Sequence, residues 1–458
     1  MPTQEKEAMN NNYSFRSMIK RYTSSSAILI LSTILALICA NTALKEFYFA
    51  LWENPISVSI GDFNLFSHNG HEMSLMAVIN DFLMAIFFLS VGLEIKREIL
   101  VGELSSPQKA LLPIIGACGG MIIPILCFLI LCPNDPQMLR GAAIPMATDI
   151  AFSLGVLSIF SKRVPLGLKV FLAALAVADD LGGIIVIALF YSTNIDTTYI
   201  ALSLICIVIL AIGNIRRVRA KSFYLLVGLA LWYTMLNSGI HATIAGVIVA
   251  FFVPASLRKA SVHYIERIRK NINSLPSHDV TGKHHTVILS NNEIHKLKSI
   301  ESAADKLISP LQALEDDLHT LIGYVIIPLF AFANVGIDLS TMSLSSIIDG
   351  VGLPVMISLV VGKFTGVLGF SWVAVKCKVV QLPKGCNWNA FIAVCMLCGI
   401  GLTVSIFIAD LSYASLGATG VTMLGQAKLG ILCGSMLSTI IGCILLNKFL
   451  PKEAVCEE

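Results

Sequence analysis

Four ionisable residues stand inside long apolar stretches of the sequence, and their types suit ion or proton chemistry. Asp149 lies midway along the fourth apolar run, Asp179 and Asp180 midway along the fifth, and Lys363 midway along the tenth. A charged residue in a membrane span costs about 2.5–3.5 kcal/mol on insertion scales, so such residues are rare and commonly functional. Four of them at one depth, with two adjacent carboxylates, indicate a functional site more than a structural clamp between helices.

The spacing of these residues suggests how they would work. Neighbouring residues on a helix point about 100° apart, so Asp179 and Asp180 cannot face one narrow site in the same way. One can face a water-filled cavity while the other meets Lys363, the only lysine or arginine that we place in mid-membrane. Burial favours the protonated carboxyl, whereas a nearby ammonium favours the carboxylate. A carboxylate balanced in this way can exchange a proton for a hard cation, and alternate opening of the site to each side gives antiport.

Composition and hydropathy predict the elements that hold these residues. Of the 458 residues, 56% are apolar and only 13% are charged, and the mean hydropathy is +0.80, whereas soluble chains carry roughly 25% charge. Because about 20 apolar residues cross a bilayer, we predict an all-α membrane protein of about 12 transmembrane helices. The predicted spans are 27–43, 74–93, 110–131, 141–160, 167–190, 199–213, 222–236, 239–255, 320–337, 352–375, 390–410 and 428–447.

Lysine and arginine counts predict the orientation of these spans. The N-terminal tail and the loops after even-numbered spans hold clusters of basic residues, whereas the alternate loops hold Lys45 and Arg140 as the only clear cases. Even-numbered spans should therefore end in the cytoplasm, with both termini on that side. The resulting organisation is a cytoplasmic tail (1–26), spans 1–8 (27–255), a cytoplasmic insert (256–318), spans 9–12 (319–449) and a second cytoplasmic tail (450–458).

Spans 4 and 11 are predicted to be interrupted. Span 4 carries Pro145 and Thr148 in mid-run, and span 11 reads C-G-I-G-L-T over 398–403. By the orientation above, spans 3–5 and 10–12 are triplets of opposite topology, and inverted-topology repeats with corresponding interruptions are typical of a transporter site at the bilayer midplane. Broken helices leave positive half-dipoles at N-termini and negative ones at C-termini. Asp149 and Lys363 have the signs that would neutralise them.

An extracytoplasmic segment, 53–70, is predicted to form a β-hairpin. Apolar residues alternate from Pro55 to Phe66 around Gly61-Asp62, which suits a turn that begins with glycine. Because a lone hairpin is marginal in water, we expect it to pair with a partner subunit. The net charge of +3 gives no indication of a nucleic-acid partner.

Other classes of protein remain to be weighed on the residues alone. Sodium-coupled uptake of an organic anion would need a larger polar pocket and an arginine for a carboxylate, and no arginine lies in mid-membrane. An intramembrane aspartyl protease could use Asp149 with Asp180, but its G-x-G-D signature is absent, as is the D-D-x-x-D of prenyl transfer. Cys395 and Cys398 form a lone C-x-x-C without the further ligands that a zinc site needs. We therefore favour antiport and expect no enzymatic activity.

Five stretches of the sequence resemble NhaA-type bacterial sodium/proton antiporters, and the resemblance covers nearly the whole chain outside 256–310. These stretches are F-F-L-S-V-G-L-E-I-K-R-E (87–98), A-T-D-I-A-F (147–152), A-D-D-L-G-G-I-I (178–185), P-L-F-A-F-A-N (328–334) and C-G-I-G-L-T-V-S-I-F-I-A (398–409).

The resemblance implies roles for individual residues. Asp180, with Asp179, would bind Na+ and carry protons, Lys363 would pair with Asp179, and Thr148 and Asp149 would belong to the crossing of the broken helices. It further implies an electrogenic exchange of Na+, and of Li+, for a larger number of protons, which serves pH and sodium homeostasis. The protein would be a multi-pass protein of the bacterial inner membrane that needs no cofactor besides the transported ions, and a homodimer joined through the 53–70 hairpin.

The resemblance also implies a pH-sensing entrance. The family pattern L-E-H-x-x-H-P reads L-E-D-D-L-H-T over 314–320, so that Asp316 and Thr320 replace a histidine and a proline while His319 remains. Histidine titrates near neutrality and aspartate far below it, and the pH set-point is therefore open. The candidate entrance or pH-sensing residues are Glu94, Glu98, Glu315, Asp316, His319 and His241.

Some of these residues also have plainer interpretations. Glu94 and Glu98 are either sensor acids or solvated helix-end charges paired with the two basic residues between them. His241, at the outer start of span 8, is either an interface histidine or a regulatory one. Asp81, in the outer third of span 2, either lines the exit path or only forms local hydrogen bonds.

Overall fold

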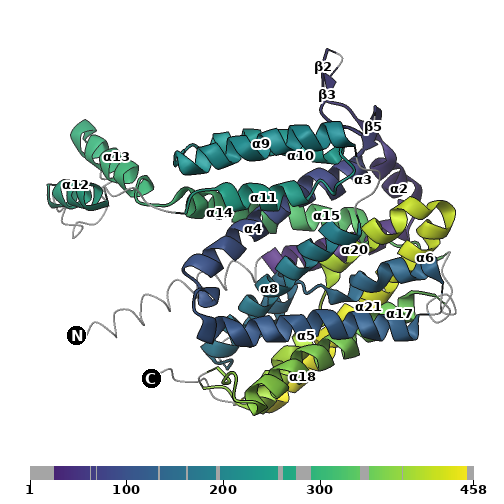
Figure 1. Ribbon diagram of the computed structural model, residues 1–458. Coiled ribbons are helices and arrows are strands. Elements are labelled where there is room, and N and C mark those ends of the chain that lie inside the picture. The colour runs from purple at the N-terminus through teal and green to yellow at the C-terminus, as the bar shows by residue number, and fades with distance from the viewer. Residues whose placement is uncertain are drawn as a thin grey trace, which may run out of the picture.

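The computed structural model is a bundle of long helices with a small β-structure at one end (Figure 1). It describes residues 25–61, 63–68, 70–132, 135–160, 163–191, 196–255, 261–274, 290–340, 350–383 and 385–450. The predicted tails therefore lie outside the described residues except at 25, 26 and 450, and so does Asp62 of the predicted turn.

The first half of the chain forms eleven helices within the described residues. They are Ser25–Ala40, α2 (Lys45–Glu53), α3 (Leu75–Val78), α4 (Met84–Leu100), α5 (Pro107–Leu131), α6 (Pro136–Leu139), α7 (Ile150–Ile159), α8 (Leu166–Phe190), α9 (Thr197–Ile215), α10 (Lys221–Leu236) and α11 (Ile244–Phe252).

The second half forms a further nine described helices. They are α12 (Ser261–Asn273), α13 (Asn291–Asp305), α14 (Pro310–Leu321), α15 (Ile327–Asn334), α17 (Gly352–Ile357), α18 (Lys363–Lys376), α19 (Trp388–Leu397), α20 (Leu402–Tyr413) and α21 (Gly417–Phe449). Helices α12 and α13 project from one end of the bundle, and the hairpin β2–β3 projects from the other (Figure 1).

Length and apolar composition make this a multi-pass α-helical membrane protein. Among the described residues, seven helices are long and apolar enough to cross a membrane, or up to nine if each of two bent helix pairs counts as one span. Two further apolar helices, Lys221–Leu236 and Trp388–Leu397, are shorter. The prediction of about 12 spans remains a prediction.

Two helices begin ten residues or more before the expected position. The helix expected to begin near 320 begins at Pro310, where Ser309 accepts a hydrogen bond from Gln312 N and proline occupies the first turn. The helix expected at 428–447 begins at Gly417. Lys428 consequently lies inside α21 with a side chain that is only 9% exposed. The predicted span, which begins at Lys428, did not indicate this burial.

Both predicted interruptions are present. A 3-10 segment, Arg140–Met146, contains Pro145 and is followed by extended backbone at 147–149 before α7 begins. The second interruption separates α19 from α20 at 398–401. Three π-helical turns lie within other helices, at Ile79–Leu83, Ser358–Gly362 and Ile322–Ile326. Such turns occur frequently at functional sites.

The segment 53–70 contains the predicted hairpin and part of a sheet that was not predicted. Strand β2 (Ser59–Ile60) pairs with β3 (Phe63–Asn64) in antiparallel register, and Gly61 adopts a φ of 62° that suits a glycine-first turn. Strands β1 (Pro55–Ile56) and β4 (Ser67–His68) flank β5 (His71–Ser74) in a second sheet. Sequence alternation did not predict β5.

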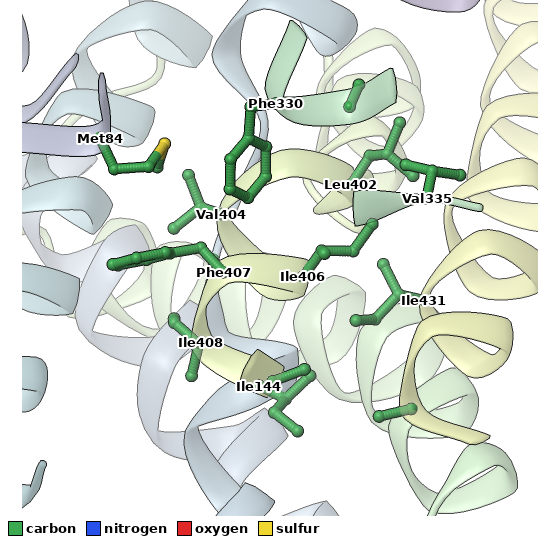
Figure 2. Packing of buried hydrophobic residues seen from close by; sticks show 14 of the residues in the cluster. Met84, Ile144, Phe330, Val335, Leu402, Val404, Ile406, Phe407, Ile408 and Ile431 are labelled. Carbon is green, nitrogen blue, oxygen red and sulfur yellow. The ribbon is translucent and has the colours of Figure 1, made fainter. Parts of the chain in front are cut away.

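The packing around the interruptions is apolar and close. Figure 2 shows the side chains of α20, including Phe407 and Ile406, against Phe330 and Ile431 from neighbouring helices. Helices α5 and α18 approach most closely at two glycines, because a Cβ on Gly119 would clash with the Gly366 carbonyl and a Cβ on Gly366 with the Gly119 carbonyl.

Candidate functional site

The two interrupted segments contact each other directly. Asp149 N donates a hydrogen bond to the Ile400 carbonyl at 2.7 Å, and the Thr148 hydroxyl donates to the Cys398 carbonyl at 3.1 Å. A Cβ at Gly401 would lie 2.6 Å from the Ala147 carbonyl oxygen, so only glycine fits there. Buried backbone groups freed by each break are thus satisfied partly by the other break, as buried polar groups require.

Asp149 completes the crossing by capping two helices. Its Oδ1 accepts the backbone N–H of Phe152 at 3.0 Å, which caps α7. Its Oδ2 accepts the Thr403 hydroxyl at 2.8 Å and the Thr403 N–H at 3.2 Å, at the start of α20. A negative charge therefore lies at two helix N-termini, where the helix dipoles favour it.

Asp179 and Lys363 form a fully buried ion pair. Lys363 Nζ lies 2.5 Å from Asp179 Oδ2, and both side chains are 0% exposed. The same oxygen accepts the Thr148 hydroxyl at 2.7 Å, and Lys363 also donates to the Met146 carbonyl. The ammonium therefore neutralises the C-terminal end of the segment before the break. Asp179 Oδ1 has no hydrogen-bond partner in the part of the chain that the structure describes.

Asp180 faces a different environment from its neighbour. It lines a cavity of about 80 Å³, and its residue is 7% exposed. Within the described ranges its carboxylate makes no hydrogen bond or ion pair. The wall of this cavity includes Thr148, Asp149, Thr403, Glu94 and His319. Asp180 is therefore a carboxylate that a small ion can reach through the cavity without first breaking a protein contact, and at the crossing it differs in this from Asp149 and Asp179.

The expected entrance residues divide into four environments. Arg97 on α4 binds Glu98 at 3.1 Å and Glu315 on α14 at 2.9 Å, and Glu94 and His319 line the cavity. Asp316 is exposed. His241 lies apart from this group: its ring packs on Phe407 at 5.7 Å and contacts the Thr243 hydroxyl at 3.2 Å.

The suggested pairing of Lys96 with the neighbouring acids does not occur. Lys96 Nζ instead donates to the Phe251 carbonyl at 2.7 Å and to the Val253 carbonyl at 2.5 Å. It thus closes the C-terminal end of α11, where cations are favoured. Sequence spacing could not show this contact, because the acceptors belong to a distant part of the chain.

One residue of the site was not proposed from the sequence. Thr403 supplies both its hydroxyl and its N–H to Asp149. The signal was available, since Thr403 ends the C-G-I-G-L-T run and is the first polar side chain after the break. Cys395 and Cys398 are free and buried, and across the described ranges no group of three or more His, Cys, Asp or Glu residues could hold a metal.

Comparison with known proteins gives the family. The family model described as Na+/H+ antiporter 1 matches residues 16–446. The chain belongs to this antiporter family. The antiporter is 47% identical over 449 residues to the Na(+)/H(+) antiporter NhaA of Phocaeicola vulgatus, a match that covers 98% of this chain and 99% of the relative.

Two further relatives extend this match. The antiporter is 47% identical over 430 residues to the Na(+)/H(+) antiporter NhaA of Bacteroides fragilis (94% and 96% coverage). It is 43% identical over 436 residues to the Na(+)/H(+) antiporter NhaA of Helicobacter pylori (94% and 94%). Membership makes the antiporter a transport protein and not an enzyme, as the sequence predicted.

Proposed function

We propose that the chain exports Na+, and also Li+, in exchange for protons, and that Asp180 alternately holds the cation and a proton. The observation that carries this proposal is the contrast between two adjacent carboxylates. Asp179 is fixed by Lys363 and Thr148, whereas Asp180 lines a cavity without a partner among the described residues. The names of the relatives support sodium and protons as the exchanged ions.

The exchange follows from the geometry of the crossing. A cation enters the cavity past Glu94 and His319 and displaces the proton held by Asp180, which leaves to the same side. Hard cations prefer oxygen ligands, and Asp179 Oδ1 has no competing hydrogen bond in the described structure. The site then opens to the other side, releases the cation and takes up protons. Reorganisation of the buried breaks, which are held by few hydrogen bonds, provides this alternating access.

The number of titratable groups supports an electrogenic exchange. Two carboxylates and one ammonium meet at the crossing, and Lys363 can release a proton when a cation replaces it beside Asp179. Together with the proton from Asp180, this allows more than one proton to cross for each Na+. No cofactor is required, because the transported ions are the only chemical species that take part.

We place the chain in the bacterial inner membrane, with twelve spans, inverted-topology repeats and cytoplasmic termini. The contact between the two breaks supports the repeats, and the opposite positions of the insert helices and the hairpin support the orientation (Figure 1). The short strands β2 and β3 have edges that can pair with a second copy, so the 53–70 hairpin joins the homodimer. Deleting it should give monomers that still exchange ions.

The acidic entrance provides regulation by pH. Glu94, Glu98, Glu315, Asp316 and His319 concentrate cations near the cavity, and protonation of this cluster reduces that attraction. We therefore propose that exchange increases as pH rises, even though Asp316 stands where the family usually has histidine. His241 packs against Phe407, away from this cluster, and we assign it to the outer side.

Ion-driven proton flux in proteoliposomes tests the proposed function. Purified protein is reconstituted with an internal pH dye, and NaCl, LiCl, KCl or choline chloride is added outside over a range of pH. We expect proton flux with Na+ and Li+ but not with K+ or choline, and a change of rate when valinomycin and K+ clamp the membrane potential. Equal flux with choline would contradict the proposal.

A further inference from the structure

A second set of charged side chains lies away from the crossing, in which Lys428 is buried and Asp81 and Asp410 are half-buried. Asp410 on α20 interacts electrostatically with Lys428 on α21 and with Asp81 in the π-helical turn Ile79–Leu83, and the residue before Asp81, Asn80, donates a hydrogen bond to Asp410. We call Asp81, Asp410 and Lys428, together with Asn80 and Asn334, the outer station.

Sequence spacing along two helices places the outer station at a defined level. Asp410 lies seven residues after Thr403, which binds Asp149. Lys428 lies seven residues before Ser435, whose hydroxyl accepts the Gly401 N–H. At 1.5 Å per residue, both are about 10 Å from the crossing. They lie toward the turn that joins α20 to α21.

This level is on the opposite side of the crossing from the cavity entrance. Asp81 and Glu94 belong to one continuous helical span, Leu75–Leu100, and are thirteen residues apart. That separation is about 20 Å along the helix. Because Glu94 lines the cavity, Asp81 must lie toward the other end of the bundle.

The outer station has few direct contacts between its charged groups. Asn80 donates to Asp410 Oδ2 at 2.9 Å, and Asn80 and Asn334 exchange side-chain hydrogen bonds at 3.2 and 2.8 Å. Lys428 forms no direct ion pair or hydrogen bond within the described chain, although its residue is 91% buried. The Asp81 carboxylate also has no hydrogen bond from any described residue. The Lys428 ammonium and the Asp81 carboxylate are thus free to bind another group, and Asp410 is held only by Asn80.

We propose that the outer station is a second cation-binding site, in which Asp81 and Asp410 hold a monovalent hard cation that Lys428 displaces. This inference rests on the proposed function, because the cation is the one released from the crossing. Asn80 positions Asp410 through its amide nitrogen, and the amide oxygens of Asn80 and Asn334 accept the hydrogen bonds within the asparagine pair. Adjacent carboxylates repel one another and so favour a bound cation. A buried lysine without a direct partner can move to replace that cation after it leaves.

An apolar layer separates the crossing from the outer station, and it explains why a second cation site would be needed. Ile406 and Phe407 lie on α20 between Thr403 and Asp410, and they pack with Phe330 in one apolar cluster (Figure 2). A cation that leaves the crossing loses its oxygen ligands and must pass this apolar layer. An unpaired charge in such surroundings is energetically costly. The first compensating charges along α20 beyond this layer are those of the outer station.

Sidedness of the sodium dependence tests this inference. Everted vesicles expose the cytoplasmic face and right-side-out vesicles expose the outer face, so the KM for Na+ is measured from each side. Asp410→Asn and Asp81→Asn should raise the outer KM on the order of tenfold, whereas Lys428→Met should lower it and slow release. The inner KM should stay the same in all three. Opposite shifts for the acid and lysine variants are not expected from a merely structural role.

Two controls keep the test decisive. Ser412→Ala changes a buried hydroxyl two residues from Asp410, which bonds Ile408 and Tyr191, and should move neither KM. If Asp410→Asn fails to fold, the double variant Asp410→Asn/Lys428→Met removes both charges and should show the raised outer KM. Normal exchange with an unchanged outer KM in Asp81→Asn and in the Asp410 variants would overturn the outer station and leave the proposed function intact.

A binding measurement separates the two proposals. NaCl should still raise the melting temperature of Asp180→Asn through the outer station, with choline chloride as the ionic-strength control, but should not raise that of Asp180→Asn/Asp410→Asn. If the wild-type protein shows no exchange, the proposed function is wrong. The melting-temperature measurement then decides by itself whether the outer station binds Na+. Equal sodium-induced shifts in the two variants would overturn it.

Discussion

Two lysine–aspartate pairs within the described helices are built differently. At the crossing, Lys363 and Asp179 lie 2.5 Å apart and are completely buried. About 10 Å further along the helices, Lys428 and Asp410 influence each other without a direct ion pair. A π-helical turn lies next to each pair. One turn directly precedes Lys363, and the other contains Asn80 and Asp81, which lie beside Asp410. The comparison indicates that a direct ion pair fixes one carboxylate of a site. A lysine and an aspartate without a direct ion pair leave room for a third charge.

The largest expected difference between the two regions is in turnover. Asp180→Asn should reduce exchange by roughly a hundredfold or more, because no described neighbour can replace its charge-assisted binding of the ion. Asp410→Asn should retain measurable turnover. Sodium-dependent proton flux of both purified variants, with melting temperatures as a control for folding, measures the contrast. Wild-type flux from Asp180→Asn would remove that residue from the site.

The second difference is in stability. Lys363→Ala leaves Asp179 as a buried unpaired carboxylate, which should cost about 3–5 kcal/mol. Lys428→Ala should cost less, about 1–3 kcal/mol, because Asp410 keeps its hydrogen bond from Asn80. Thermal unfolding in detergent compares the two variants with wild type. Equal losses of stability in the two variants would show that Lys428 and Asp410 interact as strongly as Lys363 and Asp179.

The third difference concerns access, because the inner region has an acidic entrance. Asp316→Ala removes one exposed charge, and should move the pH midpoint of exchange downward by a few tenths of a unit, since exposed charge interactions amount to about 0.2–1 kcal/mol. His319→Ala should move it further, because His319 lines the cavity. The pH profile of each variant in proteoliposomes measures the shift, and superimposable profiles would identify the entrance as an unregulated acidic helix end.

The smallest effect is expected from the same two residue types at the surface. Lys45 lies 2.5 Å from Asp338, and its hydrogen bond lowers the pKa of Asp338 from 3.8 to about 2. A lowered pKa means that the pair stabilises the fold above 3.8 and loses this effect as the pH falls through about 2. Exposed pairs contribute at most about 1 kcal/mol. Melting curves of wild type and Lys45→Ala should therefore differ slightly near neutrality and converge in acid; a constant difference would exclude Asp338 as the cause.

The inner site was largely predictable because charge stands out against an apolar background. Asp149, Asp179 and Lys363 were placed in mid-membrane from their runs alone, and all three are buried at the crossing. Proline, glycine and threonine in two runs indicated the breaks. The contact of Asp149 with Thr403 was not predictable, since it depends on how two distant segments cross.

The outer station could not be predicted from the sequence, because the position of Lys428 along its helix depends on where that helix begins. The stretch 417–428 is only weakly apolar, so the sequence placed Lys428 at the membrane surface. In the structure, a 3-10 turn (Ala414–Leu416) follows α20, and Gly417 then adopts a φ of 62° and starts α21. This tight turn places Lys428 eleven residues inside α21 and brings it level with Asp410.

The reciprocal glycine contact between α5 and α18 has a mechanical consequence. With no side chain between Gly119 and Gly366, the two backbones interlock and cannot slide past each other without a clash. Lys363 lies three residues from Gly366 and is therefore carried by a rigid pair of helices. Any motion that separates its ammonium from Asp179 must either shift α5 and α18 together against α8 or bend the π-helical turn that precedes Lys363.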